Sequence, residues 1–346
     1  MSQPNQRRGA FRRGVRLLLA AVALLAAGAT AAAKTPHATR SFQSVRLAIT
    51  IDDFPENGKL VAGWTRDSVV DAVIAALKKN HVRQVYGFAL GSFASAHPEE
   101  QSVLTRWLAA GNALGNHTYD HPHLNSVSAD AYIAGIERED RLLAALDGGG
   151  QTERQRRTFR YPYLDEGDTL AKRDAVREFL FQNGYRVAEV TANYDDWDWT
   201  TAYARCAALN DDAAVEALKS RVIAAADARL MDSVRLSRRL FHRDAPQILL
   251  MHLSPFTART LDVVLSHWAS EGVRFISLDE ALSDRVFAIN PNLPDECASC
   301  VGDHGRPFFE QIALSRGIDV RDYRNIEFSV AGIDRICTSP PGLARG

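Results

Sequence analysis

The sequence predicts an α/β fold in which about seven parallel strands form a distorted (β/α) barrel. Two observations lead to this prediction. From residue 45 onward, short β-branched runs alternate with amphipathic helical stretches, which is typical of parallel strands joined by crossover helices. In addition, polar clusters stand directly after the expected strands, where a parallel barrel gathers its functional side chains.

The first half of the expected fold alternates strand and helix. The run at 45–51 is apolar and β-branched, as in a buried strand. The next segment places Val69, Val73 and Leu77 on one helical face, and Ser128 is a candidate N-cap for a later helix. The expected order is strand 45–51, helix 67–79, strand 84–90, helix 99–110, strand 112–116 and helix 129–146.

The second half repeats the pattern with two interruptions. Residues 200–245 are helical in pattern and rich in Ala and Arg, so they predict a helical insertion. Residues 284–346 are rich in Pro, Gly and Asp and predict an irregular C-terminal extension to a domain at 41–283. The remaining elements are expected at strand 158–161, helix 169–183, strand 186–190, strand 247–253, helix 257–270 and strand 273–278.

The N-terminal segment, residues 1–33, is typical of a signal peptide. It carries five arginines, then an apolar run, then three alanines at 31–33 that suit cleavage. A retained anchor is the alternative, but a spanning helix needs about 20 apolar residues and this run is shorter. We therefore expect an exported protein, periplasmic or secreted, with no stable membrane span after cleavage.

The charge balance narrows the class of partner. Loss of residues 1–33 removes five of 41 basic residues and none of 42 acidic ones, which leaves a net charge of −6. That balance excludes a broad basic surface for nucleic acid. It favours a neutral or cationic substrate.

The four cysteines fit an oxidising compartment. Disulfides are expected there, in preference to a structural zinc site built from Cys297, Cys300, Cys337 and His304. The sequence leaves the pairing of these cysteines and Cys206 open, and a bridge from Cys337 to Cys297 or Cys300 would pin the extension.

A candidate metal site is centred on His117 and His121. Their i, i+4 spacing would bring both imidazoles to one face of a helical turn, and Asp52 or Asp53 can supply a carboxylate from the end of a buried strand. Two imidazoles, one carboxylate and open positions for water describe a catalytic zinc site. Zn²⁺ is therefore the expected cofactor, with other divalent ions as alternatives.

Three further clusters follow expected strands. His252 ends an apolar strand and suits a general acid, the alternative being a core histidine. Arg160 can pair with a carboxylate and fix its orientation, the alternative being a surface arginine. The acidic and tryptophan-rich stretch 195–199 offers a partner for these residues and aromatic faces for a sugar ring, the alternative being a solvated loop.

These clusters, taken in order, resemble the five motifs of the polysaccharide deacetylases, the NodB-homology fold of carbohydrate esterase family 4. The resemblance spans about 45–282, and the stretch 272–280 is similar to the closing strand of that family. The matching segments are Ile-Thr-Ile-Asp-Asp at 49–53, His-Thr-Tyr-Asp-His at 117–121, Arg-Tyr-Pro-Tyr at 160–163, Asp-Asp-Trp-Asp-Trp at 195–199 and Leu-Met-His at 250–252.

The resemblance implies a role for each residue of the first three motifs. Asp53, His117 and His121 would hold the metal ion. Asp52 would be the general base, and Arg160 would orient it.

The later motifs would complete the site. The main-chain N–H of Tyr163 would help to hold the oxyanion, because Pro162 has no N–H. His252 would be the general acid, tuned by Asp198, and Trp199 would line the acetyl pocket. The implied activity is hydrolysis of N-acetyl groups on an amino-sugar polymer or oligosaccharide.

One departure from the family pattern leaves the substrate open. The first motif usually ends in Asp-Asp-Gly, whereas Phe54 and Pro55 follow Asp53 here and should reshape the loop beside the metal. A deacylase that acts on a non-carbohydrate amide or an O-acetyl ester is therefore one alternative. A catalytically idle glycan-binding protein of the cell envelope is another.

Overall fold

The central strand of the sheet is β1 (Arg46–Phe54), an apolar run that is buried along almost its whole length. It lies between β2 (Tyr86–Ala89) and β7 (Gln247–His252), and β8 (Arg274–Phe275) pairs with its first residues. The computed structural model describes residues 42–55, 57–98, 101–146, 150–291, 305–323 and 332–338, which belong to one compact unit. The expected signal segment lies outside these residues.

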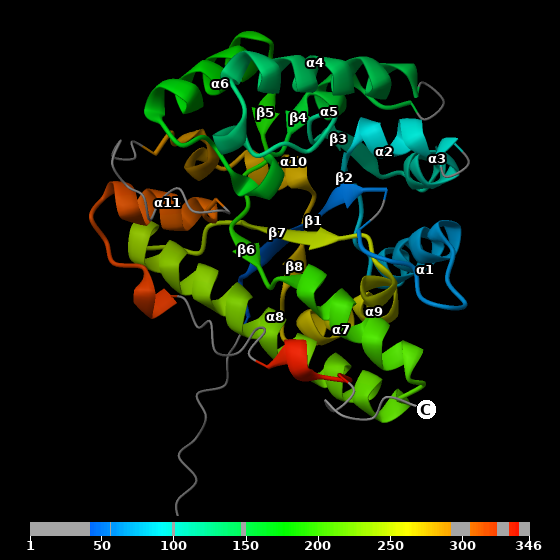
Figure 1. The fold of residues 1–346 in the computed structure, drawn as a ribbon. Coiled ribbons are helices and arrows are strands. Elements are labelled where there is room, and N and C mark those ends of the chain that lie inside the picture. The colour runs from blue at the N-terminus through cyan, green and yellow to red at the C-terminus, as the bar shows by residue number, and fades with distance from the viewer. Residues whose placement is uncertain are drawn as a thin grey trace, which may run out of the picture. The chain divides into compact units, whose positions relative to one another are not determined.

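All pairings in this sheet are parallel, and the strands run in the order β5-β4-β3-β2-β1-β7-β6 (Figure 1). No pairing joins β5 to β6 within the described ranges, so the sheet is a barrel that stays open. The predicted fold class, a distorted parallel barrel, is confirmed. The remaining strands are β3 (Ala113–Asn116), β4 (Thr158–Phe159), β5 (Arg186–Val187) and β6 (Ala192–Asn193).

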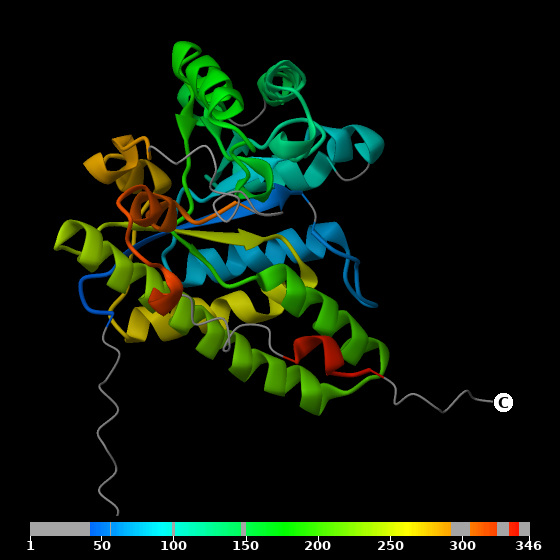
Figure 2. The same cartoon turned by 60° about the vertical axis from the view of Figure 1, so that its left-hand side comes forward.

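Helices cover both sides of the sheet, with α4 and α6 on one side and α8 on the other in both views (Figures 1 and 2). Ser128 accepts a hydrogen bond from the main-chain N–H of Ala131, so it caps α4 as the sequence predicts. The helices before residue 195 and at the closing strand are α1 (Arg66–Lys79), α2 (Gly91–Ala96), α3 (Gln101–Ala109), α4 (Ala129–Ala145), α5 (Glu153–Arg156), α6 (Leu170–Gln182), α9 (Pro255–Ser270) and α10 (Leu278–Leu282).

The predicted insertion is helical, and it forms α7 (Asp196–Ala208) and the 30-residue α8 (Asp212–Phe241). Part of the C-terminal extension is regular, in contrast to the prediction: α11 (Phe308–Ser315) packs on α8. Phe308, Phe309 and Ile312 are buried there against Leu236 and Leu240. Each such side chain contributes about 1.5–3 kcal/mol when it leaves water, which is enough to hold this short helix in place. No helix in the described part of the chain is both long and apolar enough to cross a membrane.

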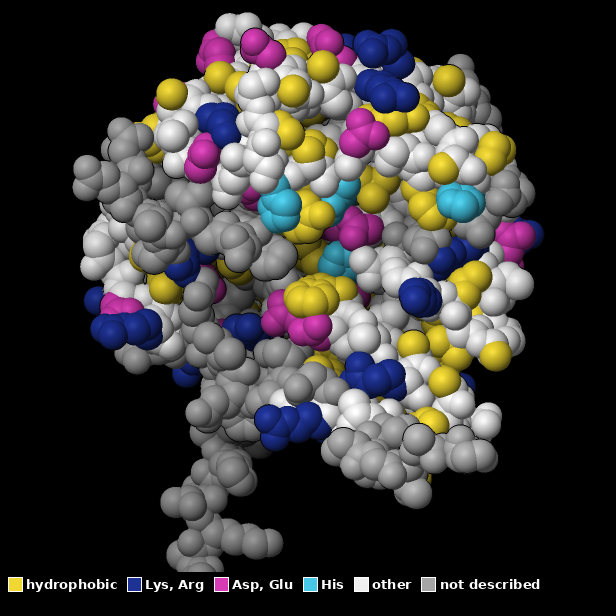
Figure 3. All heavy atoms as spheres, in the orientation of Figure 1, with side chains coloured by type: hydrophobic (Ala, Val, Ile, Leu, Met, Phe, Trp, Pro, Cys, Tyr) yellow, Lys and Arg dark blue, Asp and Glu magenta, His cyan; other side chains and the backbone are white. Residues whose placement is uncertain are grey.

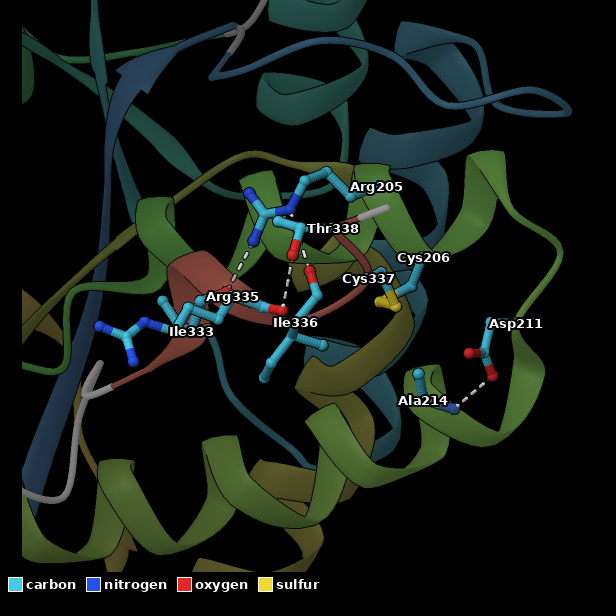
Figure 4. The surroundings of a disulfide bond; sticks show 9 residues. All are labelled: Arg205, Cys206, Asp211, Ala214, Ile333, Arg335, Ile336, Cys337 and Thr338. Atoms are coloured by element: carbon cyan, nitrogen blue, oxygen red, sulfur yellow. Dashed lines mark hydrogen bonds between the residues drawn. A yellow bond between two sulfur atoms is a disulfide. The ribbon is translucent and has the colours of Figure 1, made fainter. Parts of the chain in front are cut away.

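A disulfide joins Cys206, near the end of α7, to Cys337 (Figure 4). The pairing of Cys337 with Cys297 or Cys300 is therefore wrong; Cys297 and Cys300 lie outside the described residues. Arg205, beside Cys206, donates hydrogen bonds from Nε and Nη2 to the carbonyls of Ile336 and Ile333, at 3.0 and 2.6 Å. The disulfide and these two bonds fasten the end of the chain to the insertion.

Loss of this bridge should lower stability. The bond closes a loop of 131 residues, and Cys206→Ser frees the unfolded chain to explore more conformations. We expect the free energy of unfolding to fall by about 2–4 kcal/mol, as measured by urea denaturation. Cys337→Ser removes the same bond and should give the same midpoint, and the double variant should add nothing. A wild-type midpoint in either variant contradicts the pairing.

Candidate metal centre and active site

The carboxyl ends of four parallel strands bring the predicted site residues together. Asp52 and His252 are direct neighbours in the pairing of β1 with β7. His117 follows β3, and Arg160 follows β4. This is the face of a parallel barrel on which active sites are built.

Asp53, His117 and His121 point their ligand atoms at a common point. Oδ1 of Asp53 lies 3.0 Å from Nε2 of His121 and 3.4 Å from Nε2 of His117. One ligand atom from each of the three residues lies within 4.8 Å of the others. The set is two imidazole nitrogens and one carboxylate oxygen, which suits a divalent cation with open positions.

The surroundings of the three side chains fit a cation. Oδ1 of Asp53 is buried, yet it has no hydrogen-bond partner of good geometry in the described part of the chain. A buried carboxylate oxygen without a donor is costly, and a metal ion removes that cost. Nδ1 of His117 lies 2.8 Å from the carbonyl oxygen of Arg160. This contact directs Nε2 of His117 toward the candidate metal position.

Electrostatics also prepare these groups as ligands. Burial raises the pKa of Asp53, but the neighbouring His117 and His121 outweigh this and hold the pKa well below its ordinary value. Burial lowers the pKa of His121, so its imidazole is neutral at neutral pH. An ionised carboxylate and a neutral imidazole are the forms that bind metal.

The two histidines do not share a helical turn, in contrast to the prediction. Residues 117–121 form a loop in which Thr118 and His121 have left-handed φ angles of 62° and 53°. Such angles are incompatible with a right-handed helix and cost free energy at non-glycine residues. Two hydrogen bonds of Thr118 hold the loop. Its main-chain N–H donates to Oδ1 of Asn116, and its Oγ1 accepts a hydrogen bond from the main-chain N–H of His121.

Asp52 is oriented by a buried arginine, next to the three candidate ligands. Nη1 of Arg160 donates to both carboxylate oxygens, at 2.7 and 3.0 Å, and its Nη2 donates to Oγ1 of Thr50. The guanidinium is therefore a buried partner of Asp52 and no surface group. Oδ2 of Asp52 lies 3.9 Å from Nε2 of His117, beside the expected metal position.

His252 is paired with Asp196. Nδ1 of His252 lies 2.7 Å from Oδ1 of Asp196, and the main-chain N–H of His252 donates to Oδ2 at 2.7 Å. Burial lowers the pKa of His252, but the Asp196 carboxylate outweighs it and raises the pKa to about 9. The ring is therefore an imidazolium at neutral pH. Its Nε2 lies 3.8 Å from Oδ2 of Asp53, one of the three candidate ligands.

These groups open into one cavity of about 540 Å³. Histidine and acidic side chains gather at the centre of the face in Figure 3, where the surface is hollowed. The volume is that of a pocket for a small ligand or for a few units of a larger one. The cavity is lined by Asp52, Asp53, Asn57, His117, His121, Tyr163, Leu164, Asn193, Asp195, Trp197, Arg229, Leu250, His252, Gly305, Pro307 and Glu310.

Comparison with known proteins agrees with this geometry. The model of the polysaccharide deacetylase family matches residues 40–188. The matched segment holds the first three of the five motifs of the polysaccharide deacetylases. Peptidoglycan-N-acetylglucosamine deacetylase PgdA of Listeria monocytogenes is 23% identical over 253 residues, which are 73% of this chain and 42% of that protein. The chain thus spans less than half the length of this curated relative.

Solved structures of similar fold include two with contrasting activities. The family 4 carbohydrate esterase of Streptomyces lividans, solved in complex with acetate, is 22% identical with a TM-score of 0.45, over 69% of this chain and 96% of that one. A family 4 pseudoenzyme of Bacillus anthracis is 18% identical with a TM-score of 0.45, over 68% of this chain and 65% of that one.

Two residues of the fourth family motif are placed differently from the prediction. The carboxylate that contacts His252 belongs to Asp196, whereas the resemblance implied Asp198. Trp199, implied for the acetyl pocket, is fully buried and stacks on Phe256. Trp197 lines the cavity instead and is 42% exposed.

The other implied residues lie at the cavity of this polysaccharide deacetylase fold. Tyr163 is in its wall, and the Tyr163 ring stacks on His123 with centroids 3.6 Å apart. The Phe54 side chain lies away from the cavity, packed on Trp107 in the core. Asn57 lies in the cavity wall beside the candidate ligands and donates from Nδ2 to Oδ2 of Asp53 at 3.0 Å.

Sequence reasoning named no residue in the wall that the insertion and the extension supply. Arg229 of α8 lies in it and pairs with Asp195, with Nη2 and Oδ2 3.3 Å apart. Pro307 and Glu310 come from the extension. Arg229, Pro307 and Glu310 stand in no recognisable motif. The one available signal was the length of the insertion between two motifs, which placed it near the site without naming a residue.

Proposed function

We propose that this chain is a metal-dependent hydrolase that removes N-acetyl groups from an amino-sugar polymer or oligosaccharide and releases acetate. The observation that carries the proposal is the separation of three functions in one cavity. Asp53, His117 and His121 form a candidate ligand set. Asp52 is held by Arg160 beside this set. His252 is held by Asp196, with its Nε2 3.8 Å from Oδ2 of Asp53. Hydrolysis of an amide needs these three parts.

Asp53, His117 and His121 would hold the cation, which we propose to be zinc from its mixed nitrogen and oxygen donors. A bound zinc ion lowers the pKa of water and polarises a carbonyl oxygen. Asp52 takes a proton from the attacking water, because the two hydrogen bonds from Arg160 hold this carboxylate in a fixed orientation beside the ligand set. His252 then donates the Nε2 proton to the departing amine nitrogen as the C–N bond breaks, so the products are an amine and acetate.

Two further groups complete this proposed mechanism. The main-chain N–H of Tyr163 donates to the oxyanion that forms from the acetyl carbonyl. The exposed Trp197 offers an aromatic face to a sugar ring at the cavity wall. We also propose export to the periplasm or the exterior, supported by the arginine-rich, apolar segment at 1–33 and by the Cys206–Cys337 disulfide.

Acetate release tests the proposed activity. The full chain is reconstituted with zinc and incubated with chitin oligomers, peptidoglycan fragments, poly-N-acetylglucosamine and acetylated xylan. We expect acetate from at least one N-acetylated glycan, because the relatives are named as deacetylases of peptidoglycan and of chitooligosaccharide. Turnover of small amides or of the xylan ester without any N-acetylglycan turnover points to the non-carbohydrate or O-ester alternative. Saturable glycan binding without any turnover points to an idle binding protein.

The pH dependence tests the role of His252. As a general acid it must be protonated, so activity should fall as pH rises through its pKa of about 9. Asp196→Asn removes the carboxylate that raises this pKa, so the alkaline limb of kcat should move to lower pH by at least about one unit. The matched variant Asp198→Asn, two residues away, should leave the limb in place. A limb that moves in Asp198→Asn and stays in Asp196→Asn reverses the assignment.

A further inference from the structure

Residues 305–313, here called the C-terminal brace, cross the loops that follow β4 and β5. The main-chain N–H of Gly305 donates to the carbonyl of Tyr163 at 2.9 Å, and that of Phe308 donates to the carbonyl of Val190 at 2.6 Å. Nε2 of Gln311 donates to Oε1 of Glu166 at 2.8 Å. The brace therefore contacts the turn that carries Tyr163.

The contact at Gly305 leaves no room for a side chain. A Cβ atom at this position would lie 1.4 Å from the carbonyl oxygen of Leu164 and 2.8 Å from the nitrogen of Asp165. Both atoms belong to the main chain, so no flexible side chain can move aside. Any other residue at 305 must displace either the brace or the turn.

The turn beneath Gly305 has a strained backbone. Tyr163 and Leu164 have left-handed φ angles of 57° and 54°. Two consecutive non-glycine residues in this region need support from their surroundings. Inside the turn, the N–H groups of Leu164 and Asp165 donate to the carbonyls of Tyr161 and Pro162. Gly305 supports the turn from the opposite side. It has no side chain to clash with the main chain of Leu164, and its N–H donates to the carbonyl of Tyr163.

The brace also forms part of the cavity wall. Gly305, Pro307 and Glu310 line the same cavity as His121 and Tyr163. Its anchor lies elsewhere, because Phe308, Phe309 and Ile312 are buried against α8. The residues that pack α11 on α8 are thus different from the residue that contacts the turn.

We propose that Gly305 is a positioning residue of the active site, which fixes the Tyr163–Leu164 turn so that the Tyr163 N–H faces the reacting carbonyl. The inference rests on the proposed function, which assigns that N–H to the oxyanion. It makes the C-terminal extension a working part of the site. A displacement of about 1 Å at such a donor is expected to affect the transition state more than the bound substrate.

Gly305→Ala tests the proposal in the full, zinc-reconstituted chain. We expect kcat on the best glycan to fall about 10- to 100-fold, with KM changed less than about threefold. Hydrogen exchange at the amides of Leu164 and Asp165 should accelerate at least about tenfold, because the turn loses its support. Zinc stoichiometry should stay at the wild-type value. The control is Gly317→Ala, just past the end of α11, where a Cβ meets nothing within 4 Å and strains only its own left-handed φ.

Each outcome decides the matter. Gly305→Ala with wild-type kcat and wild-type exchange overturns the inference. Equal losses in Gly305→Ala and Gly317→Ala also overturn it, because the effect then comes from a weaker α11. Hydrogen exchange needs no turnover, so a wild-type chain that releases no acetate defeats the proposed function while the exchange data still judge the support of the turn.

Discussion

Replacing Asp52 by asparagine lowers kcat by about 10²–10⁴-fold and leaves zinc binding in place, if Asp52 is the general base. Asparagine has the shape of aspartate but takes no proton at neutral pH. Both carboxylate oxygens of Asp52 accept hydrogen bonds from Arg160, and neither belongs to the candidate ligand set. The variant therefore removes the base and spares the three ligands. The measurements are kcat with the best glycan and zinc content by elemental analysis.

The control for this variant removes a charge at the surface. Asp262→Asn breaks an exposed ion pair with Lys79, in which Oδ2 and Nζ are 2.7 Å apart, and should leave kcat unchanged. Because Asp52→Asn leaves a buried arginine without its charged partner, unfolding must be measured as well. A folded, zinc-bound Asp52→Asn with wild-type kcat refutes the assignment of the base.

His117→Ala should abolish stoichiometric zinc binding and turnover together. Loss of a group that only orients a ligand costs about 10–100-fold in metal affinity, so loss of a ligand should exceed 100-fold. Zinc should stabilise the wild-type chain by about 2.7 kcal/mol at a concentration of 100 Kd, and should not stabilise the variant. Equilibrium dialysis and thermal unfolding with and without zinc check both points.

A second histidine provides the comparison. His97 is exposed and packs against Phe93 with the two rings tilted, outside the residues that line the cavity. His97→Ala should bind one equivalent of zinc, with the same stabilisation as the wild-type chain. Full zinc occupancy in His117→Ala places the metal elsewhere and removes the basis of the proposed reaction.

The fold was accessible from the sequence because its signals are local. Short apolar runs such as that of β1 alternate with helices whose apolar faces repeat at the helical period. Ser128 caps α4 as expected. Strand ends were informative for the same reason, since parallel strands bring distant residues such as Asp52 and His252 to one edge. The short β6 and the helix α2 have too few residues for a periodic signal.

The errors at the fourth motif arise from helical phase. In Asp-Asp-Trp-Asp-Trp, the acidic and aromatic residues alternate, and α7 begins at Asp196. Residues two apart on a helix point about 200° apart, so of Asp196 and Asp198 one faces His252. The same geometry sends Trp199 to the core and leaves Trp197 at the cavity. Sequence alone gives the alternation but not its phase.

The wall of the cavity was not accessible for a different reason. Arg229 meets Asp195 from 34 residues away, and Gly305 meets Tyr163 across 142 residues. Neither contact repeats a pattern or matches a motif of the family. The tight fit at Gly305 depends on two backbones that approach each other, which no residue type announces.

The tie between Cys337 and α7 has a consequence for the timing of synthesis. A chain emerges from the ribosome N-terminus first, at about 5–20 residues per second. Asp52 therefore appears roughly 15–60 s before Cys337, and His121, the last of the three candidate ligands, appears roughly 9–37 s before Gly305. A nascent chain carries ligands and base without the wall that faces them. The cavity wall is made after the three candidate ligands and the candidate base, so we expect the proposed activity only once residues 305–313 have emerged.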